Sequence, residues 1–274
     1  MIKILRSLQL LSLLLVIAIT IISCRQLKVN APDDSKKASR KAELALIDKR
    51  LGAEQDSIIY WHEHREIDNA DNNLEAANAK FEAVLLEALN KYHELLDYDF
   101  KFLDKPVTSP NKKLSAYSWD TQMGGTMRDY QTIFQYQVKD GTKAENFTDI
   151  GEDGEVYLCT DIFSIVTKYG IVYMPVTFMT ESSLYYYNSV KFLVIKDNKL
   201  IPINLIKSDE DMQDNVGVEY INYYGQERTN IPEKLIEFDS KNQILKIVRT
   251  DDKQNIINAY DLYKFNGTYF ENQK

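Results

Sequence analysis

Glycine and proline are scarce in this chain, with 10 and 6 among 274 residues. So little of either excludes a collagen-like fibre, which needs glycine at every third position. Apolar residues make up 44% and charged residues 27%, which is ordinary globular composition and excludes a wholly disordered chain. Only one long apolar run occurs, at the N-terminus, so a multi-pass membrane protein is excluded as well.

A surplus of basic residues is also missing. Lys and Arg number 33 against 41 Asp and Glu, which gives a formal charge of −8. Proteins that bind nucleic acid need Lys and Arg in excess to neutralise phosphates. We therefore expect no nucleic-acid partner.

The N-terminal segment predicts export from the cytoplasm. Lys3 and Arg6 precede an apolar run of 15 residues, from Leu8 to Ile22. As a helix this run would span about 22 Å, which is shorter than the hydrocarbon core of about 30 Å. A cleaved signal peptide therefore fits better than a transmembrane anchor.

The end of this segment carries more information. Ile21-Ile22-Ser23-Cys24 resembles the lipobox of bacterial lipoproteins, in which a small residue precedes an invariant cysteine. The resemblance implies diacylglyceryl transfer to the Cys24 thiol, cleavage after Ser23 and N-acylation of Cys24, the lipidation site. The following residue is Arg25 and not Asp, which resembles lipoproteins of the outer membrane. The alternative is a plain secretory signal in which Cys24 is incidental.

Cysteine is nearly absent from the remaining chain. Cleavage after Ser23 would remove 23 residues and two positive charges, leaving 251 residues with a formal charge of −10. Cys159 would then be the only cysteine besides the lipidated one, so no disulfide could form within the monomer. We expect Cys159 to be a buried, inert thiol in a strand.

Sequence patterning divides the chain into four parts. These are a signal peptide (1–23), a lipidated tether (24–35), a helical hairpin (36–98) and an antiparallel β domain (106–274). In the second helix Leu74, Phe81, Ala88 and Leu95 recur every seven residues. This apolar stripe predicts packing on the hairpin itself or on the C-terminal part, and a partner chain is the alternative.

Beyond residue 106 short runs of strand-forming residues recur every 8 to 14 residues, with no amphipathic helix between them. Antiparallel pairing by hairpins is favoured, and the fold class is α+β. Asn266-Gly267 predicts a hairpin with a type I′ turn, and Asp197-Asn198-Lys199 predicts a second hairpin.

No catalytic or metal-binding constellation stands out, and we expect no catalytic residues, metal or cofactor. His62 and His64 are two apart, so on a helix they point to different sides, and His93 lies on the next helix. All three histidines precede residue 94, which disfavours a Ser-His-Asp hydrolase in the strand-rich part. Two acidic clusters suit Ca²⁺ by ligand type but lack EF-hand spacing, and we interpret them as solvated turns: Asp149, Glu152, Asp153 and Glu155, and Asp209, Glu210, Asp211 and Asp214.

Tyrosine is the one residue in clear surplus, with 18 in the chain, of which 15 lie beyond residue 98. Exposed tyrosines favour recognition of proteins or glycans, although strand propensity alone also enriches tyrosine. In the run Tyr185-Tyr186-Tyr187 the first and third share one strand face. We select as candidate binding residues Tyr185, Tyr187, Tyr223 and Tyr224.

These observations favour a membrane-anchored extracytoplasmic lipoprotein with a non-enzymatic binding or inhibitor role in the bacterial cell envelope, at the outer membrane. Its expected partners are the membrane, through the lipid anchor, and an envelope protein or a glycan. One alternative is a carboxylate-dependent envelope hydrolase. Another is an envelope scaffold that assembles through the helical hairpin.

Overall fold

The computed structural model describes residues 34–125, 127–150, 157–208, 211–221 and 232–273. The chain divides into two compact units, residues 1–47 and 48–274. In the first unit the described part is helical, and Arg40 forms an ion pair of 3.0 Å with Glu43 one turn later. No helix in the described ranges is both long and apolar enough to cross a membrane.

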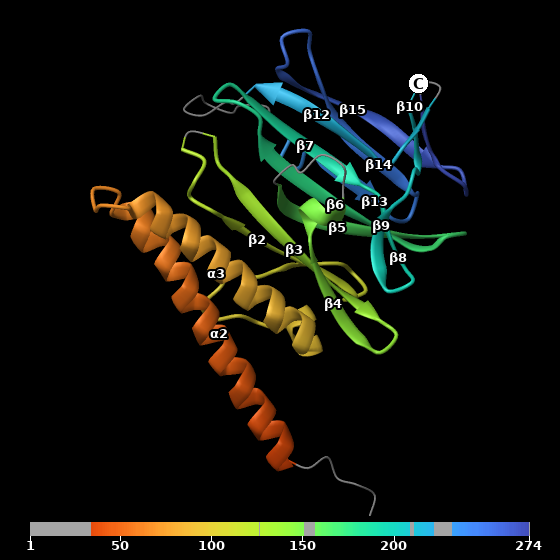
Figure 1. The fold of residues 1–274 in the computed structure, drawn as a ribbon. Helices are drawn as coiled ribbons and strands as arrows, with labels where there is room; N and C mark the ends of the chain where they lie inside the picture. The colour runs from red at the N-terminus through yellow and green to blue at the C-terminus, as the bar shows by residue number, and fades with distance from the viewer. Residues whose placement is uncertain (1–33, 126, 151–156, 209–210, 222–231, 274) are drawn as a thin grey trace, which may run out of the picture. The chain divides into compact units, whose positions relative to one another are not determined.

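Helix α3 (Ala70–Lys91) follows α2 (Asp34–Glu63), and the short helix η1 (His93–Asp97) continues the same apolar stripe. Leu74, Phe81, Ala88 and Leu95 are all buried. The stripe packs on strands of the following sheet, and the ring of Phe81 lies edge-on to that of Trp119, with centroids 5.0 Å apart. The predicted amphipathic helix is therefore confirmed, and its stripe belongs to the core of the second unit. Figure 1 shows α3 running alongside the strands of this sheet.

Gly52 lies inside α2, where glycine costs helical stability. The structure gives the reason for its presence. A Cβ at Gly52 would lie 2.4 Å from the Cβ of Phe102, so only glycine lets residues 101–102 approach the helix. One turn earlier, the buried carboxylate of Asp48 accepts hydrogen bonds from the backbone N–H groups of Lys101 and Phe102, at 2.9 and 3.3 Å.

The strands form three sheets. The first, sheet A, is antiparallel and contains β1 (Val107–Thr108), β2 (Leu114–Asp120), β3 (Tyr130–Val138) and β4 (Gly141–Asn146), in that order. The short helix η2 (Phe147–Ile150) follows β4. Sheet A lies between α3 and the next sheet, so that β3 is buried on both faces.

Sheet B is the middle layer. Its strand order is β12-β7-β6-β8-β9, with β5 paired to the other edge of β6. Its strands are β5 (Leu158–Thr167), β6 (Gly170–Thr180), β7 (Tyr185–Lys191), β8 (Leu193–Lys196), β9 (Lys199–Pro202) and β12 (Asn215–Ile221). Pro175, which has no N–H to donate, lies where the partner of β6 changes from β7 to β8.

Sheet C forms the outer layer and has the strand order β11-β10-β16-β15-β14-β13. One pair in it is parallel, β10 with β16, and the others are antiparallel. Its strands are β10 (Ile206–Ser208), β11 (Asp211–Gln213), β13 (Ile236–Asp239), β14 (Ile244–Thr250), β15 (Ile256–Phe265) and β16 (Phe270–Asn272). Two helices followed by mostly antiparallel sheets confirm the predicted α+β class.

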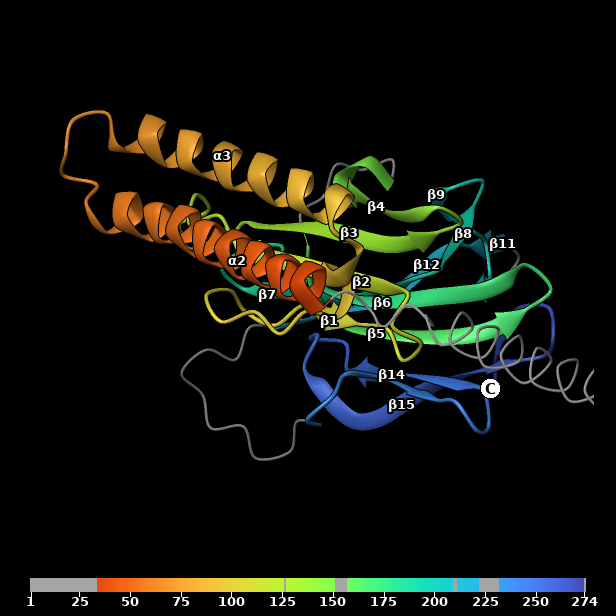
Figure 2. The ribbon, with the colours of Figure 1, turned by 90° about the horizontal axis from the view of Figure 1, so that it is seen from below.

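Two apolar clusters hold the layers together. Tyr173 of β6 lies in the cluster between sheets A and B, while its neighbours Val172 and Met174 lie in the cluster between sheets B and C. This alternation buries both faces of β6, as expected for a middle sheet. Figure 2 shows β14 and β15 on one side of β5 and β6, and β3 and β4 on the other.

Both predicted hairpins are present, but the turn at Asn266-Gly267 differs from expectation. Asp197 and Asn198 form a two-residue loop in which both φ angles are positive, at 52° and 60°, as a type I′ turn requires. The Asn266-Gly267 hairpin has a four-residue loop, and only Gly267 has a positive φ in it. The predicted type I′ turn is wrong there, because the Asn266 Oδ1 atom accepts hydrogen bonds from the N–H groups of Thr268 and Tyr269.

Candidate functional site

A hollow of about 420 Å³ is lined by residues of sheet B, by the segment that leads into β13, and by Ile236 and Ile256 of sheet C. We call it the Tyr186 hollow. Pockets for small ligands usually enclose roughly 300–1,000 Å³. The residues that line it are Thr160, Asp161, Val176, Phe178, Tyr186, Asn188, Tyr220, Pro232, Glu233, Lys234, Leu235, Ile236 and Ile256.

A β-bulge in β5 shapes one side of the hollow. Cys159 pairs with Thr177 and Asp161 pairs with Val176, so Thr160 is an extra residue in β5. Cys159 and Ile162, on either side, both belong to the cluster between sheets A and B. The two residues between them therefore both line the hollow, which a regular strand would not allow.

Asn188 places a buried amide against the hollow. On its face of β7 it follows Tyr186 and precedes Val190, which lies in the core between sheets B and C. Asn188 is only 9% exposed. Its Oδ1 atom accepts a hydrogen bond of 2.8 Å from the Tyr220 hydroxyl, while its Nδ2 atom has no partner among the described residues. The Nδ2 atom is therefore available to donate a hydrogen bond to a ligand in the hollow.

Four aromatic rings run in a row from sheet A into the hollow. The centroids of Tyr130 and Phe178 are 6.1 Å apart, those of Phe178 and Tyr186 are 5.1 Å apart, and those of Tyr186 and Tyr220 are 5.9 Å apart. Each pair meets edge to face, the preferred geometry for aromatic contacts. The row gives one wall of the hollow a rigid aromatic surface.

The outer end of this row carries a cation. Arg128 forms an ion pair of 3.2 Å with Asp120. Burial raises the pKa of the Tyr130 hydroxyl, although the nearby Arg128 opposes this effect. The pKa of the Arg128 guanidinium is raised by its proximity to Tyr130 and to Asp120. The phenol therefore stays protonated and the guanidinium stays charged around neutral pH.

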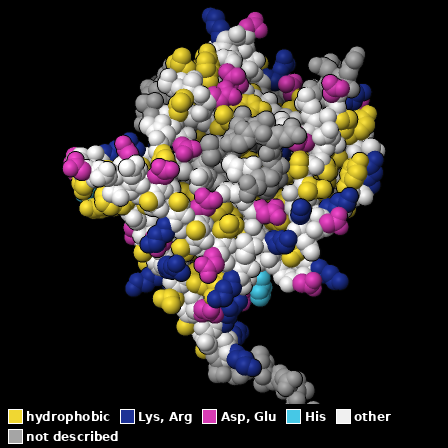
Figure 3. All heavy atoms as spheres, in the orientation of Figure 1, with side chains coloured by type: hydrophobic (Ala, Val, Ile, Leu, Met, Phe, Trp, Pro, Cys, Tyr) yellow, Lys and Arg dark blue, Asp and Glu magenta, His cyan; other side chains and the backbone are white. Residues whose placement is uncertain are grey.

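An ion pair bridges two walls of the hollow. Lys234 Nζ lies 2.9 Å from Asp161 Oδ2, which joins the segment before β13 to the bulge in β5. The hydrogen bond and the charge of Asp161 raise the pKa of the Lys234 ammonium group. Glu233 also lines the hollow, so the charges at its wall sum to one negative. On the molecular face drawn in Figure 3, acidic and basic side chains are interspersed.

The tyrosines selected from the sequence lie elsewhere. Tyr185 and Tyr187 occupy the face of β7 opposite to Tyr186 and are absent from the lining of the hollow. Tyr187 packs over Gly217, where an added Cβ would lie 2.5 Å from the ring. Tyr223, Tyr224 and the lipidation site Cys24 lie outside the described residues. The sequence analysis missed Tyr186 and Asn188, although their strand alternation with the core residue Val190 pointed to a shared face.

The histidines do not come together. His62 Nδ1 lies 3.2 Å from the Gln122 carbonyl oxygen, His64 stacks on Tyr60 at 4.2 Å, and His93 Nδ1 is 3.3 Å from a Glu94 carboxylate oxygen. The described ranges contain no group of three or more His, Cys, Asp or Glu side chains suited to a metal ion. The first acidic cluster lies outside the residues whose side chains are described, and in the second only Asp211 and Asp214 are described.

Cys159 lies in β5 as predicted, and its side chain is buried. Burial raises the pKa of its thiol, which donates a hydrogen bond of 3.4 Å to the backbone oxygen of Asp161. A protonated, covered thiol is a poor nucleophile. Cys159 therefore helps to hold the bulge and adds no reactive group to the hollow.

Comparison of the chain with protein-family models, with curated proteins and with solved structures finds no match. The geometry of the hollow must therefore carry the functional argument by itself.

Proposed function

We propose that this protein is a lipid-anchored binding protein of the bacterial cell envelope that holds its ligand in the Tyr186 hollow. The observation that carries the proposal is the combination of a rigid aromatic wall with the unpartnered Nδ2 donor of Asn188. Recognition sites are typically concave and largely apolar, with a few well-placed polar groups. The lipobox-like sequence ending at Cys24 supports the anchor and the location, at the outer membrane.

The carboxylates at the hollow support binding over hydrolysis. A carboxylate-dependent hydrolase needs one carboxyl group that stays protonated to act as general acid. The Asp161 Oδ2 atom lies 2.9 Å from the Lys234 ammonium group, so this oxygen is already engaged in an ion pair at the wall of the hollow. Asp161 is therefore suited to hold a wall of the hollow and to accept hydrogen bonds.

Removing the Tyr186 ring should abolish most of the binding. The test uses the full chain, immobilised in a zwitterionic detergent without a sugar headgroup, and solubilised envelope material as the analyte. We expect Tyr186→Ala to weaken retention about tenfold or more, because the buried contact of the ring contributes roughly 1.5 kcal/mol or more to the binding free energy. Biolayer interferometry measures the effect.

The adjacent residue provides a matched control. Tyr185→Ala removes the same ring from the opposite face of β7, so it should retain the material like the unmodified chain. Circular dichroism checks that both variants are folded. Equal retention by both variants would show that the hollow is not the binding site, and the proposal would be wrong.

The anchor has its own test. We expect Cys24→Ser to move the protein from the membrane fraction to the soluble fraction, because the acyl chains require the thiol and the processed N-terminus of Cys24. Cell fractionation with immunoblotting measures the distribution. Cys159→Ser is the control and should stay with the membrane. If Cys24→Ser also stays with the membrane, the lipoprotein interpretation is wrong.

A further inference from the structure

The walls of the Tyr186 hollow combine apolar and hydrogen-bonding surface in a way that restricts the ligand. The aromatic row and Val176 form one apolar side, and Pro232, Leu235 and Ile256 contribute more apolar surface. The polar groups are the Asn188 amide, the Thr160 hydroxyl, the Asp161 carboxylate and the Tyr186 hydroxyl, the last without a hydrogen-bond partner in the described ranges. A fitting ligand is apolar on one face and carries both donors and acceptors at its edge.

The charges restrict the ligand further. Asp161 is paired with Lys234, and Glu233 leaves the wall with one negative charge in excess. A phosphate, sulfate or carboxylate ligand would have to compete with Asp161 for Lys234 and would meet Glu233 as well. The hollow therefore disfavours anionic ligands and suits neutral ones.

The position of the hollow disfavours an extended peptide. Peptides that add to a sheet need an open strand edge, where unpaired backbone N–H and C=O groups are available. The hollow lies over the face of sheet B, and β7 at its centre is paired with β6 on one side and with β12 on the other. Recognition must therefore come from side chains and not from backbone pairing.

We propose that the Tyr186 hollow binds a neutral carbohydrate, with a sugar ring against the aromatic row and its hydroxyl groups bonded to the Asn188 Nδ2 donor and the Asp161 carboxylate. Sugar rings have an apolar face of C–H groups and an edge of hydroxyl groups that both donate and accept, which matches the two surfaces of the hollow. Asn and Asp side chains are planar and offer the complementary donors and acceptors. This inference rests on the proposed binding function and names the class of ligand.

The test uses the full chain in the same detergent, with solubilised envelope material that is either untreated, oxidised with periodate or digested with protease. Periodate cleaves the bond between carbons that carry adjacent hydroxyl groups, so it destroys most sugars. We expect periodate to reduce the Tyr186-dependent retention about tenfold or more, and protease digestion to leave it largely unchanged. Retention that survives periodate would overturn the carbohydrate proposal.

A substitution at Asn188 tests the polar contact. Asn188→Asp keeps the oxygen that accepts the bond from the Tyr220 hydroxyl but removes the Nδ2 donor and adds a negative charge. We expect it to weaken retention of the untreated material about tenfold. Unchanged retention would show that the amide does not contact the ligand and would overturn the proposal.

The outcomes separate the two proposals. If Tyr186→Ala loses retention and periodate does not affect the unmodified chain, the protein binds in the hollow but its ligand is not a carbohydrate. If retention is lost when the envelope material is digested with protease but not when it is oxidised with periodate, the ligand is a protein instead. If the Tyr186→Ala variant retains the envelope material as well as the unmodified chain does, the proposed function and the carbohydrate inference are both wrong.

Discussion

Replacing Phe270 with alanine is expected to lower the free energy of unfolding by about 3–5 kcal/mol, the usual cost of removing a buried aromatic ring. The Phe270 side chain is fully buried between sheets B and C. Its ring centroid lies 5.5 Å from that of Phe192, 5.2 Å from that of Phe265 and 6.2 Å from that of Phe238. Alanine would leave a cavity that these three rings cannot fill without leaving their own contacts.

The position of Phe270 in the chain makes the effect informative. Strand β16 has only three residues, yet it lies between β10 and β15, and the Phe270 N–H donates a hydrogen bond of 2.7 Å to the Leu205 carbonyl oxygen. Denaturant unfolding followed by circular dichroism measures the loss of stability. Leu262→Ala on β15, where the side chain is 37% exposed, is the control and should cost about 1 kcal/mol or less. Similar losses for both variants would contradict the assignment of Phe270 to the core.

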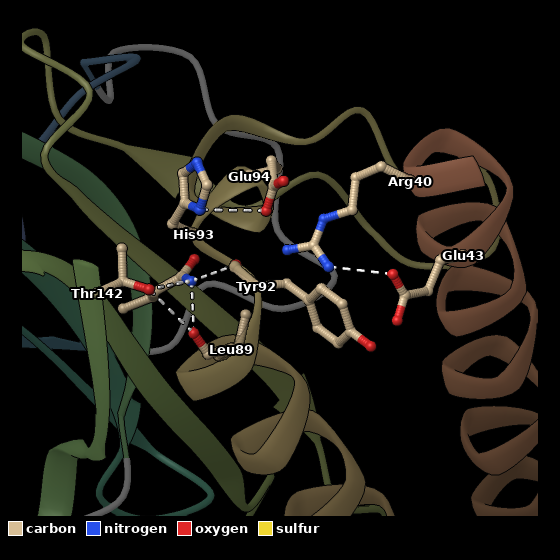
Figure 4. A network of polar contacts seen from close by, with 8 residues as sticks. Arg40, Glu43, Leu89, Tyr92, His93, Glu94 and Thr142 are labelled. Atoms are coloured by element: carbon tan, nitrogen blue, oxygen red, sulfur yellow. Dashed lines mark hydrogen bonds and ion pairs between the residues drawn. The ribbon is translucent and has the colours of Figure 1, made fainter. Parts of the chain in front are cut away.

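Replacing Gln135 with leucine is expected to destabilise the protein by about 3 kcal/mol, although the volume of the side chain is conserved. The Gln135 side chain is fully buried between β3 and the end of α3. Its Nε2 atom donates to the carbonyl oxygens of Leu89 and Tyr92, at 2.7 and 3.0 Å, and to the Thr142 hydroxyl at 3.3 Å (Figure 4). Its Oε1 atom accepts a hydrogen bond of 3.0 Å from the Tyr117 hydroxyl.

The cost arises because Gln135 caps the C-terminal end of helix α3. The last carbonyl groups of a helix have no partner within it, and here a buried side chain supplies one. Leucine cannot donate, so polar groups would lose their hydrogen bonds in a buried place. Denaturant unfolding measures this loss as well. An unchanged slope of the unfolding free energy against denaturant concentration would show that the variant still folds to the same extent.

The same strand offers a matched control for Gln135. The buried Oε1 atom of Gln131 has no hydrogen-bond partner in the described part of the chain. Gln131→Leu removes this atom without breaking a bond at it, so we expect no loss of stability or a small gain. If Gln131→Leu and Gln135→Leu were equally destabilising, the cost would come from the change in shape, and the capping role of Gln135 would be wrong.

Local patterns predicted much of the fold. The seven-residue spacing of Leu74, Phe81, Ala88 and Leu95 identified one buried helical stripe correctly, because side chains at that spacing share a helix face. Short strands without intervening helices identified the antiparallel sheets. The turn at Asn266 was predicted less well, since the Asn side chain can stabilise more than one kind of turn.

The candidate site was beyond the reach of these patterns. The alternation in Tyr185-Tyr186-Tyr187 places these side chains on two faces of β7, but the pattern does not tell which face lines a hollow. The bulge at Thr160 is marked by neither glycine nor proline, and without it Thr160 and Asp161 would point to opposite faces. The selection of Tyr185 and Tyr187 followed the exposed-tyrosine argument, and the structure brings Tyr186 together with Tyr220 instead.

The sequence alone determined the class of fold, the buried face of α3 and the order of helices and strands, because each depends on residues close together in the chain. The lipid anchor at Cys24 stays a prediction from the same source. Only the tertiary structure decided which tyrosines share a hollow with Asn188 and with the ion pair of Asp161 and Lys234. Those residues come from separate strands and a connecting segment, and their proximity depends on how two sheets pack and where one strand bulges.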